Sequence, residues 1–177
     1  RSMNENIPTW SEDERKFSSV KYHISSTGKI ETASGCLQVD FANRYVGGGV
    51  LGNGCVQEEI RFVLNPELII AKLFTESLAD GEALIISGTE QFNSYRGYAS
   101  SFQFAGDFID TTPQDDYYRR KCRIVAIDAL CYKNYHEQFR EWNLVREINK
   151  AFVGFTKSND FDVSPVATGF WGAGAFQ

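Results

Sequence analysis

The sequence has few of the residues that commonly build metal centres. Its 177 residues include only four cysteines and two histidines. The cysteines are Cys36, Cys55, Cys122 and Cys131, and no two of them form a C-x-x-C pair. We therefore expect no structural zinc site and no other metal or cofactor. Reduced thiols in an intracellular protein are the better interpretation of these cysteines.

The sequence also lacks long apolar runs and a surplus of positive charge. No apolar stretch reaches the roughly 18 residues of a membrane helix, and no basic-then-apolar leader opens the chain. Lys and Arg number 18 against 23 Asp and Glu, which gives a net charge of −5. This balance excludes a broad basic groove for DNA, but it leaves room for a local site that binds an anion.

Glycine and aromatic residues are the informative part of the composition. The chain has 15 Gly, 14 Phe, 8 Tyr and 3 Trp, a mixture that suits ring-lined pockets and tight turns. An apolar fraction of 42% and this length are enough for one globular domain with a core. Because the chain starts at Arg1 and stops after the glycine-rich run 172–176, we expect a piece of a longer protein.

Strands and helices are expected to alternate along the chain. Alternating apolar and polar residues predict a strand at 37–41, and short apolar stretches predict strands at 83–87, 123–129 and 166–168. Residues 20–24 and 30–32 could form a hairpin around Thr27-Gly28. Helices are predicted at 56–64, from Pro66 to about Leu78, and at 135–154. Residues 1–16 are interpreted as a lead-in loop or short capped turn, and 88–120 as loop. This alternation predicts an α/β sandwich with a mixed sheet.

Two glycine-rich loops each follow a predicted strand. Gly47-x-Gly49-x-x-Gly52 formally matches the dinucleotide fingerprint, but intervening residues and the helix stop at Pro66 make that match poor. Exposed backbone N–H groups could still approach a phosphate or ribose, although a sharp turn without a ligand is an open alternative. Because ligands lie beyond the carboxyl ends of strands in open sheets, both loops can converge on one ligand.

A pair of acids follows the first loop. Glu58 and Glu59 are adjacent, so on a helix their side chains point about 100° apart. One could act as general acid and base while the other holds substrate hydroxyls. The alternative is that both complement the positive end of the helix dipole.

The motifs together resemble the poly(ADP-ribose) glycohydrolase family. The resemblance lies in 47–49, a seven-residue spacer and Gln57-Glu58-Glu59, with further likeness at 37–44, 60–62, 65–69, 88–92, 124–129 and 167–176. It implies a macrodomain, a three-layer α/β/α sandwich with a mixed sheet. It also implies hydrolysis of ribose–ribose O-glycosidic bonds with release of ADP-ribose, which reverses ADP-ribosylation in the DNA damage response.

The resemblance also implies roles for individual residues. Glu59 would be the catalytic acid/base, Glu58 would bind ribose hydroxyls across the scissile bond, and Asp40 would be a supporting acid. Substrate-binding roles would fall to Asn43 at the reacting ribose, to Gln57, Gly47, Gly48 and Gly49 at the catalytic loop, to Phe41 at the adenine end, to Tyr98 over the terminal unit, and to Gly172, Ala173, Gly174 and Phe176 around the diphosphate and ribose. Taken alone, each of the three aromatic side chains could be an ordinary packed ring, and Asp40 a turn acid.

The expected organisation and partners complete the hypothesis. Residues 1–177 would form a single, partial macrodomain, without the accessory helical region and the C-terminal part of the domain that the family carries. The partners would be poly(ADP-ribose), ADP-ribose and, through the polymer, ADP-ribosylated proteins, with no direct DNA or membrane binding. We expect a nuclear or cytoplasmic monomer. A non-catalytic ADP-ribose reader is the main alternative, and a nucleotide-dependent oxidoreductase is disfavoured by the interrupted fingerprint.

Overall fold

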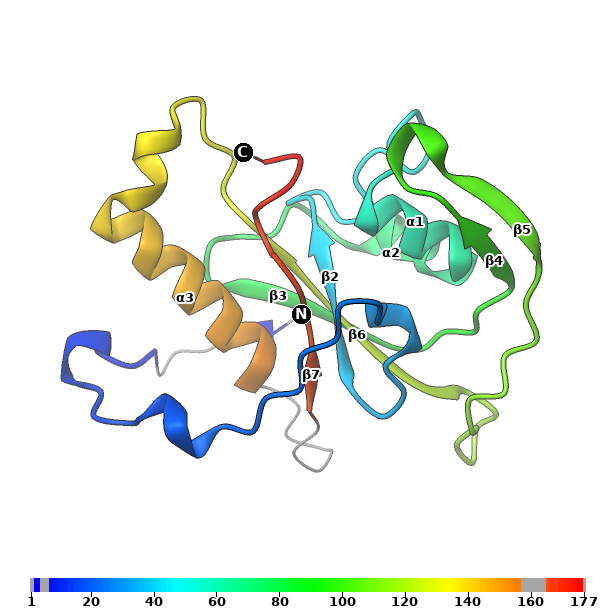
Figure 1. Ribbon diagram of the computed structural model, residues 1–177, viewed down its shortest axis with the longest axis horizontal. Coiled ribbons are helices and arrows are strands. Elements are labelled where there is room, and N and C mark those ends of the chain that lie inside the picture. Colours follow the sequence, from blue (N-terminus) through cyan, green and yellow to red (C-terminus); the bar gives the residue numbers. More distant parts are fainter. Residues whose placement is uncertain (1, 4–6, 157–164, 177) are drawn as a thin grey trace.

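The fold is built on a five-stranded mixed sheet. A computed structural model describes residues 2–3, 7–156 and 165–176. The strands are β1 (Ser2–Met3), β2 (Leu37–Ala42), β3 (Glu82–Gly88), β6 (Arg120–Asp128) and β7 (Val166–Ala167), and they lie in the order β1-β3-β6-β2-β7. β3 pairs antiparallel with β1 and β6, whereas β2 pairs parallel with β6 and β7 (Figure 1). The parallel part of the sheet brings the carboxyl ends of β2, β6 and β7 to one edge.

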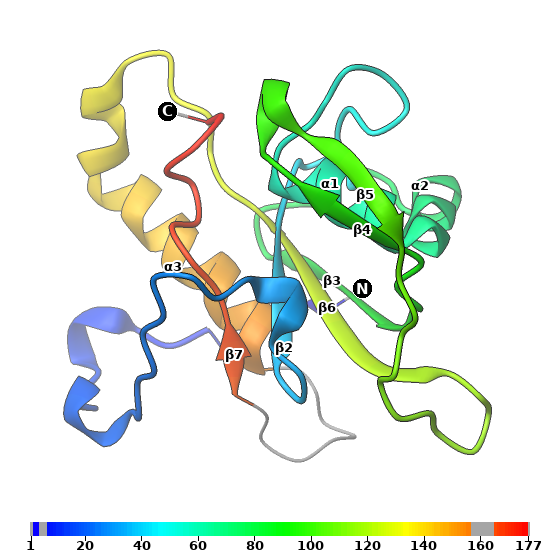
Figure 2. The ribbon, with the colours of Figure 1, turned by 45° about the vertical axis from the view of Figure 1, so that its right-hand side comes forward.

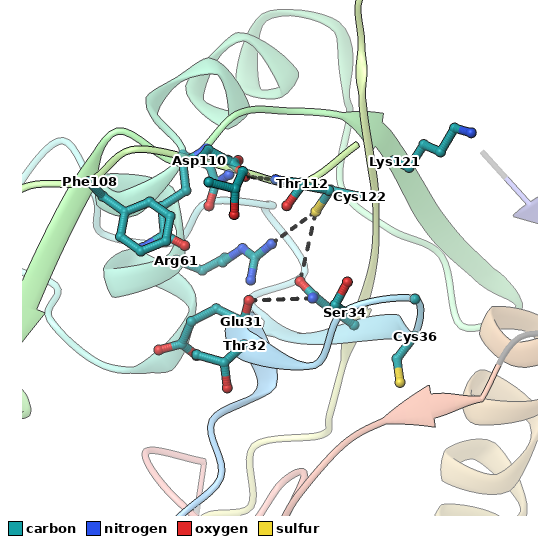
Figure 3. Close-up of a pocket in the computed structure, with 15 residues that line it drawn as sticks. Glu31, Thr32, Ser34, Cys36, Arg61, Phe108, Asp110, Thr112, Lys121 and Cys122 are labelled. Atoms are coloured by element: carbon teal, nitrogen blue, oxygen red, sulfur yellow. Dashed lines mark hydrogen bonds between the residues drawn. The ribbon is translucent and has the colours of Figure 1, made fainter. Parts of the chain in front are cut away.

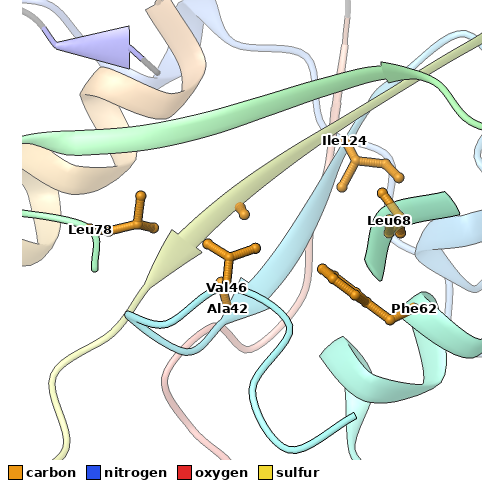
Figure 4. Close-up of a cluster of buried hydrophobic side chains, with 7 residues drawn as sticks. Ala42, Val46, Phe62, Leu68, Leu78 and Ile124 are labelled. Carbon is orange, nitrogen blue, oxygen red and sulfur yellow. The ribbon is translucent and has the colours of Figure 1, made fainter. Parts of the chain in front are cut away.

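The central strand β6 is buried on both faces, which explains its continuous apolar sequence. Ile124 and Ala126 belong to one core with Phe62 of helix α1 (Gln57–Leu64), and Figure 4 shows this cluster. Val125 and Ile127 point to the other face and pack with Val153 of helix α3 (Glu141–Thr156). The two cores confirm the three-layer α/β/α sandwich and its mixed sheet.

The predicted helices are present, but two of them have different bounds. The first is confirmed as α1. The second is a short 3-10 helix, Pro66–Ile70, followed by α2 (Ala71–Phe74), so its expected end near Leu78 is wrong. The predicted helix over 135–154 is divided at Arg140, whose ψ of 134° is extended. A 3-10 turn, Tyr135–Phe139, precedes that break, and α3 follows it.

The predicted hairpin over 20–32 is wrong. The structure has a 3-10 turn at Ile30–Thr32 and no strand between residues 20 and 32, and another 3-10 turn, Phe17–Ser19, precedes this segment. The apolar side chains that suggested strands are exposed, with Val20 at 51% and Ile24 at 92%, so no buried face would stabilise a ribbon. The lead-in segment carries a 3-10 turn at Trp10–Glu12, and its residues 2–3 form the edge strand β1, which the loop prediction missed.

Residues 88–120 contain a hairpin that was predicted as loop. β4 (Asn93–Arg96) and β5 (Gln103–Asp107) pair antiparallel, with an irregularity between Ser94 and Tyr95. The hairpin is fastened to the end of α1, because Phe92 N donates to Leu64 O at 2.9 Å and Asn93 Nδ2 donates to Val63 O at 2.8 Å. No helix in the described ranges is long and apolar enough to cross a membrane.

Candidate active site

The first glycine loop folds over the start of α1. Gly48 has φ +43°, and a Cβ there would lie 2.5 Å from Glu59 Oε1 and 2.8 Å from Glu58 Oε2. A Cβ on Gly54 would lie 2.7 Å from Glu59 Oε1. Glycine is therefore required at both positions, because two carboxylates pack directly against the loop backbone.

Both acids bind backbone N–H groups of this loop. Glu58 accepts hydrogen bonds from Gly47 N at 2.5 Å and Asn43 N at 2.8 Å. Glu59 accepts from Gly49 N at 3.0 Å and reaches back to Val56 N, the residue before the helix, at 3.0 Å. The amide groups expected at phosphate and ribose are thus paired with the carboxylates of Glu58 and Glu59, and their contact with substrate stays a prediction.

Asp40 is the third acid of this cluster. It lies on β2, is only 1% exposed, and neither carboxyl oxygen has a hydrogen-bond partner within the described part of the chain. Burial raises the pKa of Asp40, the charge of Glu59 raises it further, and Arg61 acts in the opposite direction. Burial and the neighbouring Asp40 also raise the pKa of Glu58, against the effect of its two backbone donors. Asp40 and Glu58 therefore retain protons to a higher pH than exposed carboxyl groups do.

Gln57 fixes the helix to the sheet. Its Oε1 accepts from Phe41 N at 2.8 Å, and its Nε2 donates to Val39 O at 3.1 Å. The strand partner β7 stops opposite Gln38, so the Gln57 amide continues the hydrogen bonding along this edge of β2. This contact sets the position of the two glutamates that follow, and the predicted ribose contact of Gln57 remains untested.

Lys72 of α2 is a site residue that the sequence reasoning missed. Its Nζ donates to Val46 O at 3.3 Å and Gly48 O at 3.1 Å, so it holds the carbonyl side of the loop whose N–H groups hold the glutamates. A Cβ on Gly47 would lie 3.0 Å from the Lys72 stem. Nothing in the local sequence marks this lysine, because its contact joins residues about 25 positions apart in the chain.

The second glycine loop lies at the same edge of the sheet. It follows β7 toward the C-terminus, and the two views place it with the first loop at the carboxyl ends of the strands (Figures 1 and 2). Trp171 Nε1 donates to Ile127 O at 3.0 Å, and Phe176 O accepts from Tyr132 N at 3.3 Å. A Cβ on Gly169 would contact the ring of Phe41 at 3.5 Å. Convergence on one ligand is consistent with this placement. Trp171, an anchor of the loop, was not predicted.

Two further predicted binding residues, Tyr98 and Asn43, lie in the loops that follow β4 and β2. Tyr98 is 54% exposed beside the tip of the β4–β5 hairpin, and its N donates to Ser101 Oγ at 3.0 Å. Asn43 accepts from Tyr45 N at 3.0 Å through Oδ1, which shapes the turn that leaves β2. The hairpin is also bonded to the 3-10 turn Ile30–Thr32, because Tyr95 OH donates to Glu31 Oε1 at 2.7 Å.

A separate hollow lies near the amino ends of β2 and β6. Its volume is about 220 Å³, and none of the predicted site residues lines it. Figure 3 shows Arg61 directed into this region, where its Nη2 donates to Cys122 Sγ at 3.3 Å. Arg61 therefore lines the hollow, and its positive charge also lowers the pKa of Asp40 in the acid cluster.

The architecture and the acid-bearing glycine loop define an α/β domain of the Macro domain fold. A family model described as Poly (ADP-ribose) glycohydrolase (PARG), Macro domain fold, matches residues 7–177, and the chain belongs to this family. It is 52% identical over 147 residues to Poly(ADP-ribose) glycohydrolase 1 of Arabidopsis thaliana, covering 82% of this chain and 26% of that protein. Against Poly(ADP-ribose) glycohydrolase 2 of Caenorhabditis elegans the identity is 39% over 163 residues, covering 84% and 33%. The chain thus spans about a quarter to a third of the length of these two relatives.

Proposed function

We propose that the protein hydrolyses the ribose–ribose O-glycosidic bonds of poly(ADP-ribose) and releases ADP-ribose, with Glu59 as the acid/base. The observation that carries this proposal is the attachment of Glu58 and Glu59 to one glycine loop. Four backbone N–H groups fix both carboxylates at the edge of the sheet where ligands of α/β domains bind.

The chemistry follows from this arrangement. Glycoside hydrolysis passes through an oxocarbenium-like ribose, which a nearby carboxylate stabilises. Glu59 protonates the leaving ribose oxygen and then accepts a proton from the attacking water. Its neighbours Asp40 and Glu58 have raised pKa values, so they carry less negative charge at neutral pH than exposed carboxyl groups do. Glu58 holds hydroxyl groups of the riboses on either side of the bond.

Backbone groups of the glycine loop and aromatic side chains are proposed to contribute more to substrate recognition than Lys and Arg side chains do. Gly172, Ala173 and Gly174 would wrap the diphosphate, Phe176 and Phe41 would meet the ribose and adenine ends, and Tyr98 would cover the terminal unit. A glycine-rich backbone can bind a diphosphate without Lys or Arg, which agrees with the net charge of −5. We further propose that the protein is a monomer and that it acts in the nucleus or cytoplasm. The four free cysteines agree with a reducing compartment.

The test compares the complete protein with its Glu59→Gln variant on labelled polymer. Wild type should release ADP-ribose, and the variant should be slower by about 10³-fold while it still binds polymer. Glu14→Gln, an exposed acid far from the loop in sequence, is the control and should keep full activity. Equal activity of Glu59→Gln and wild type would refute the assignment. Polymer binding by wild type without turnover would identify a reader instead.

A further inference from the structure

A basic hollow lies at the end of the molecule opposite the glycine loops. Its volume is about 410 Å³, and one acid, Asp115, is among its lining residues. Four basic residues at the start of β6 line it: Arg119, Arg120, Lys121 and Arg123. Two of these residues are ion-paired, Arg119 with Asp115 and Arg120 with Glu90, each at 2.7 Å. Lys121 is exposed and the Arg119 side chain is 58% exposed, so these two residues present positive charge to an anion in solvent.

A rigid turn beside the hollow displays two aromatic rings. Asp115 Oδ1 accepts from Tyr117 N at 2.9 Å and Arg119 N at 3.0 Å, and Asp115 O accepts from Tyr118 N at 3.0 Å. These bonds hold Tyr118 at φ +62°, a conformation that a bulky residue rarely adopts. The side chains of Tyr117 and Tyr118 are nevertheless 77% and 83% exposed, so the turn presents rings to solvent instead of packing them.

Arg119 joins the turn to the hollow. Its guanidinium lies 5.1 Å from the centre of the Tyr117 ring and 2.7 Å from Asp115 Oδ2. Its stem packs on Gly88, another lining residue, where a Cβ would be 3.0 Å away. Lys121 adds an exposed cation, and Figure 3 shows its side chain pointing away from Arg61. The Tyr117 ring therefore adjoins Arg119, which lines the hollow together with Lys121.

We propose that this surface binds a distant nucleotide unit of the same anionic polymer, an inference that rests on the proposed function. An adenine ring stacks on Tyr117 or Tyr118, and the diphosphate lies against Arg119 and Lys121. Stacking on exposed rings beside basic groups is how proteins bind single-stranded nucleotide polymers. The nine residues of β6 place this surface about 26 Å from the carboxyl edge of the sheet. Only a substrate of several linked units reaches both ends.

The test removes the rings and one cation while it preserves the turn. The variant is Tyr117→Ala/Tyr118→Gly/Lys121→Gln, and glycine at 118 adopts positive φ without strain. The matched control is Tyr22→Ala/Lys21→Gln, which removes an equally exposed ring and lysine from the blue segment on the other side of the molecule (Figure 1). Equilibrium binding of labelled long polymer, of a two-unit oligomer and of single-stranded DNA is measured for both variants and for the wild-type protein.

The proposal predicts a length-dependent loss. The dissociation constant for long polymer should rise about tenfold in the triple variant, and its salt slope should fall by about one. Binding of the two-unit oligomer, and every binding constant of the control, should not change. Unchanged long-polymer binding, or equal loss for long and short ligands, would overturn the proposal. So would loss of single-stranded DNA binding alone, which would assign the surface to nucleic acid. A wild type that binds polymer but releases no ADP-ribose would refute only the proposed function.

Discussion

Two buried aspartates on neighbouring parallel strands have opposite surroundings. Asp128, at the end of β6, is 5% exposed and lies 2.7 Å from Arg146 Nη2 and 2.6 Å from Lys150 Nζ. Asp40, on β2, is 1% exposed, and its oxygens make no hydrogen bond with the described residues. Asp128 is in register with Ala42, two residues beyond Asp40 on the neighbouring strand. Asp128 is ion-paired with two cations, whereas Asp40 is affected by the charges of Arg61 and Glu59 without an ion pair among the described residues.

The difference distinguishes a structural ion-pair network at Asp128 from the proposed catalytic site at Asp40. Lys150 also donates to Ala79 O at 2.6 Å and Glu82 O at 2.7 Å, so the Asp128 network fastens α3 to the sheet. Asp40 forms no ion pair with the residues that the structure describes, and the raised pKa values of Asp40 and Glu58 mean that these two carboxyl groups hold protons at a higher pH than exposed ones. Buried acids with shifted pKa values are typical of catalytic sites, whereas fully paired ones are typical of structural networks.

Breaking the paired network should have the largest effect on stability. Lys150→Met leaves two buried carbonyls without their donor and removes one of the two cations from Asp128. The free energy of unfolding should fall by about 3 kcal/mol, as for other buried pairs that lose one partner. Urea denaturation measures this change. Lys133→Met, an exposed lysine, should leave the midpoint almost unchanged. A loss no larger than that of the control would show that the network does not hold α3.

Removing the Lys72 hydrogen bonds to the first glycine loop should have a smaller effect, and this effect should fall on activity instead of stability. Lys72→Met frees the carbonyls of Val46 and Gly48, so the loop that orients Glu58 and Glu59 becomes less well positioned. We expect kcat to fall about tenfold with little change in KM. Lys72→Arg, which can donate to the same carbonyls, should recover most of the rate. If Met and Arg variants are equally slow, the hydrogen bonds of Lys72 are not the cause.

The raised pKa values of Asp40 and Glu58 should also make the free energy of unfolding depend on pH. Because the native pKa values of Asp40 and Glu58 are raised, the folded protein binds more protons than the unfolded chain above the ordinary carboxyl pKa of about 4. Their contribution is therefore complete below that pH and is lost as pH rises through the native pKa values, by at most about 1.4 kcal/mol per pH unit for each proton. Unfolding by urea at several pH values should show a shallower decline for Glu58→Gln than for wild type. An identical slope would show that Glu58 does not take up the proton.

The sequence predicted best those elements whose signal is local. The strand predicted at 37–41 follows from alternating apolar and polar residues, the strand predicted at 123–129 from a continuous apolar run, and α1 from its first-turn acids and the stop before Pro66. The β4–β5 hairpin was not predicted, because the irregularity after Ser94 and the glycines at 97 and 106 interrupt the alternation of apolar and polar residues that is typical of a β-ribbon. The hairpin over 20–32 was predicted from a pattern that has no buried face in the fold.

The candidate site was predicted at the level of residues but not of contacts. The resemblance identified the acids and glycines, and the structure brings Asp40, Glu58 and Glu59 together with the glycine loop. Local sequence could not predict that the loop amides bind the glutamates, that Gln57 pairs with the edge of β2, or that Lys72 supports the loop. Each of these contacts joins residues 10 to 26 positions apart and exists only once helix and sheet are packed.

The most direct test makes the same change in both regions. Asp128→Asn and Asp40→Asn each replace a buried carboxyl by an amide, and the free energy of unfolding and the rate of ADP-ribose release are measured for both. Asp128→Asn should lose about 3 kcal/mol of stability while its folded fraction keeps the wild-type rate. Asp40→Asn should keep the wild-type stability while its rate falls at least tenfold. A loss of stability in Asp40→Asn as large as that in Asp128→Asn, with an unchanged rate, would contradict the division between a structural and a catalytic cluster.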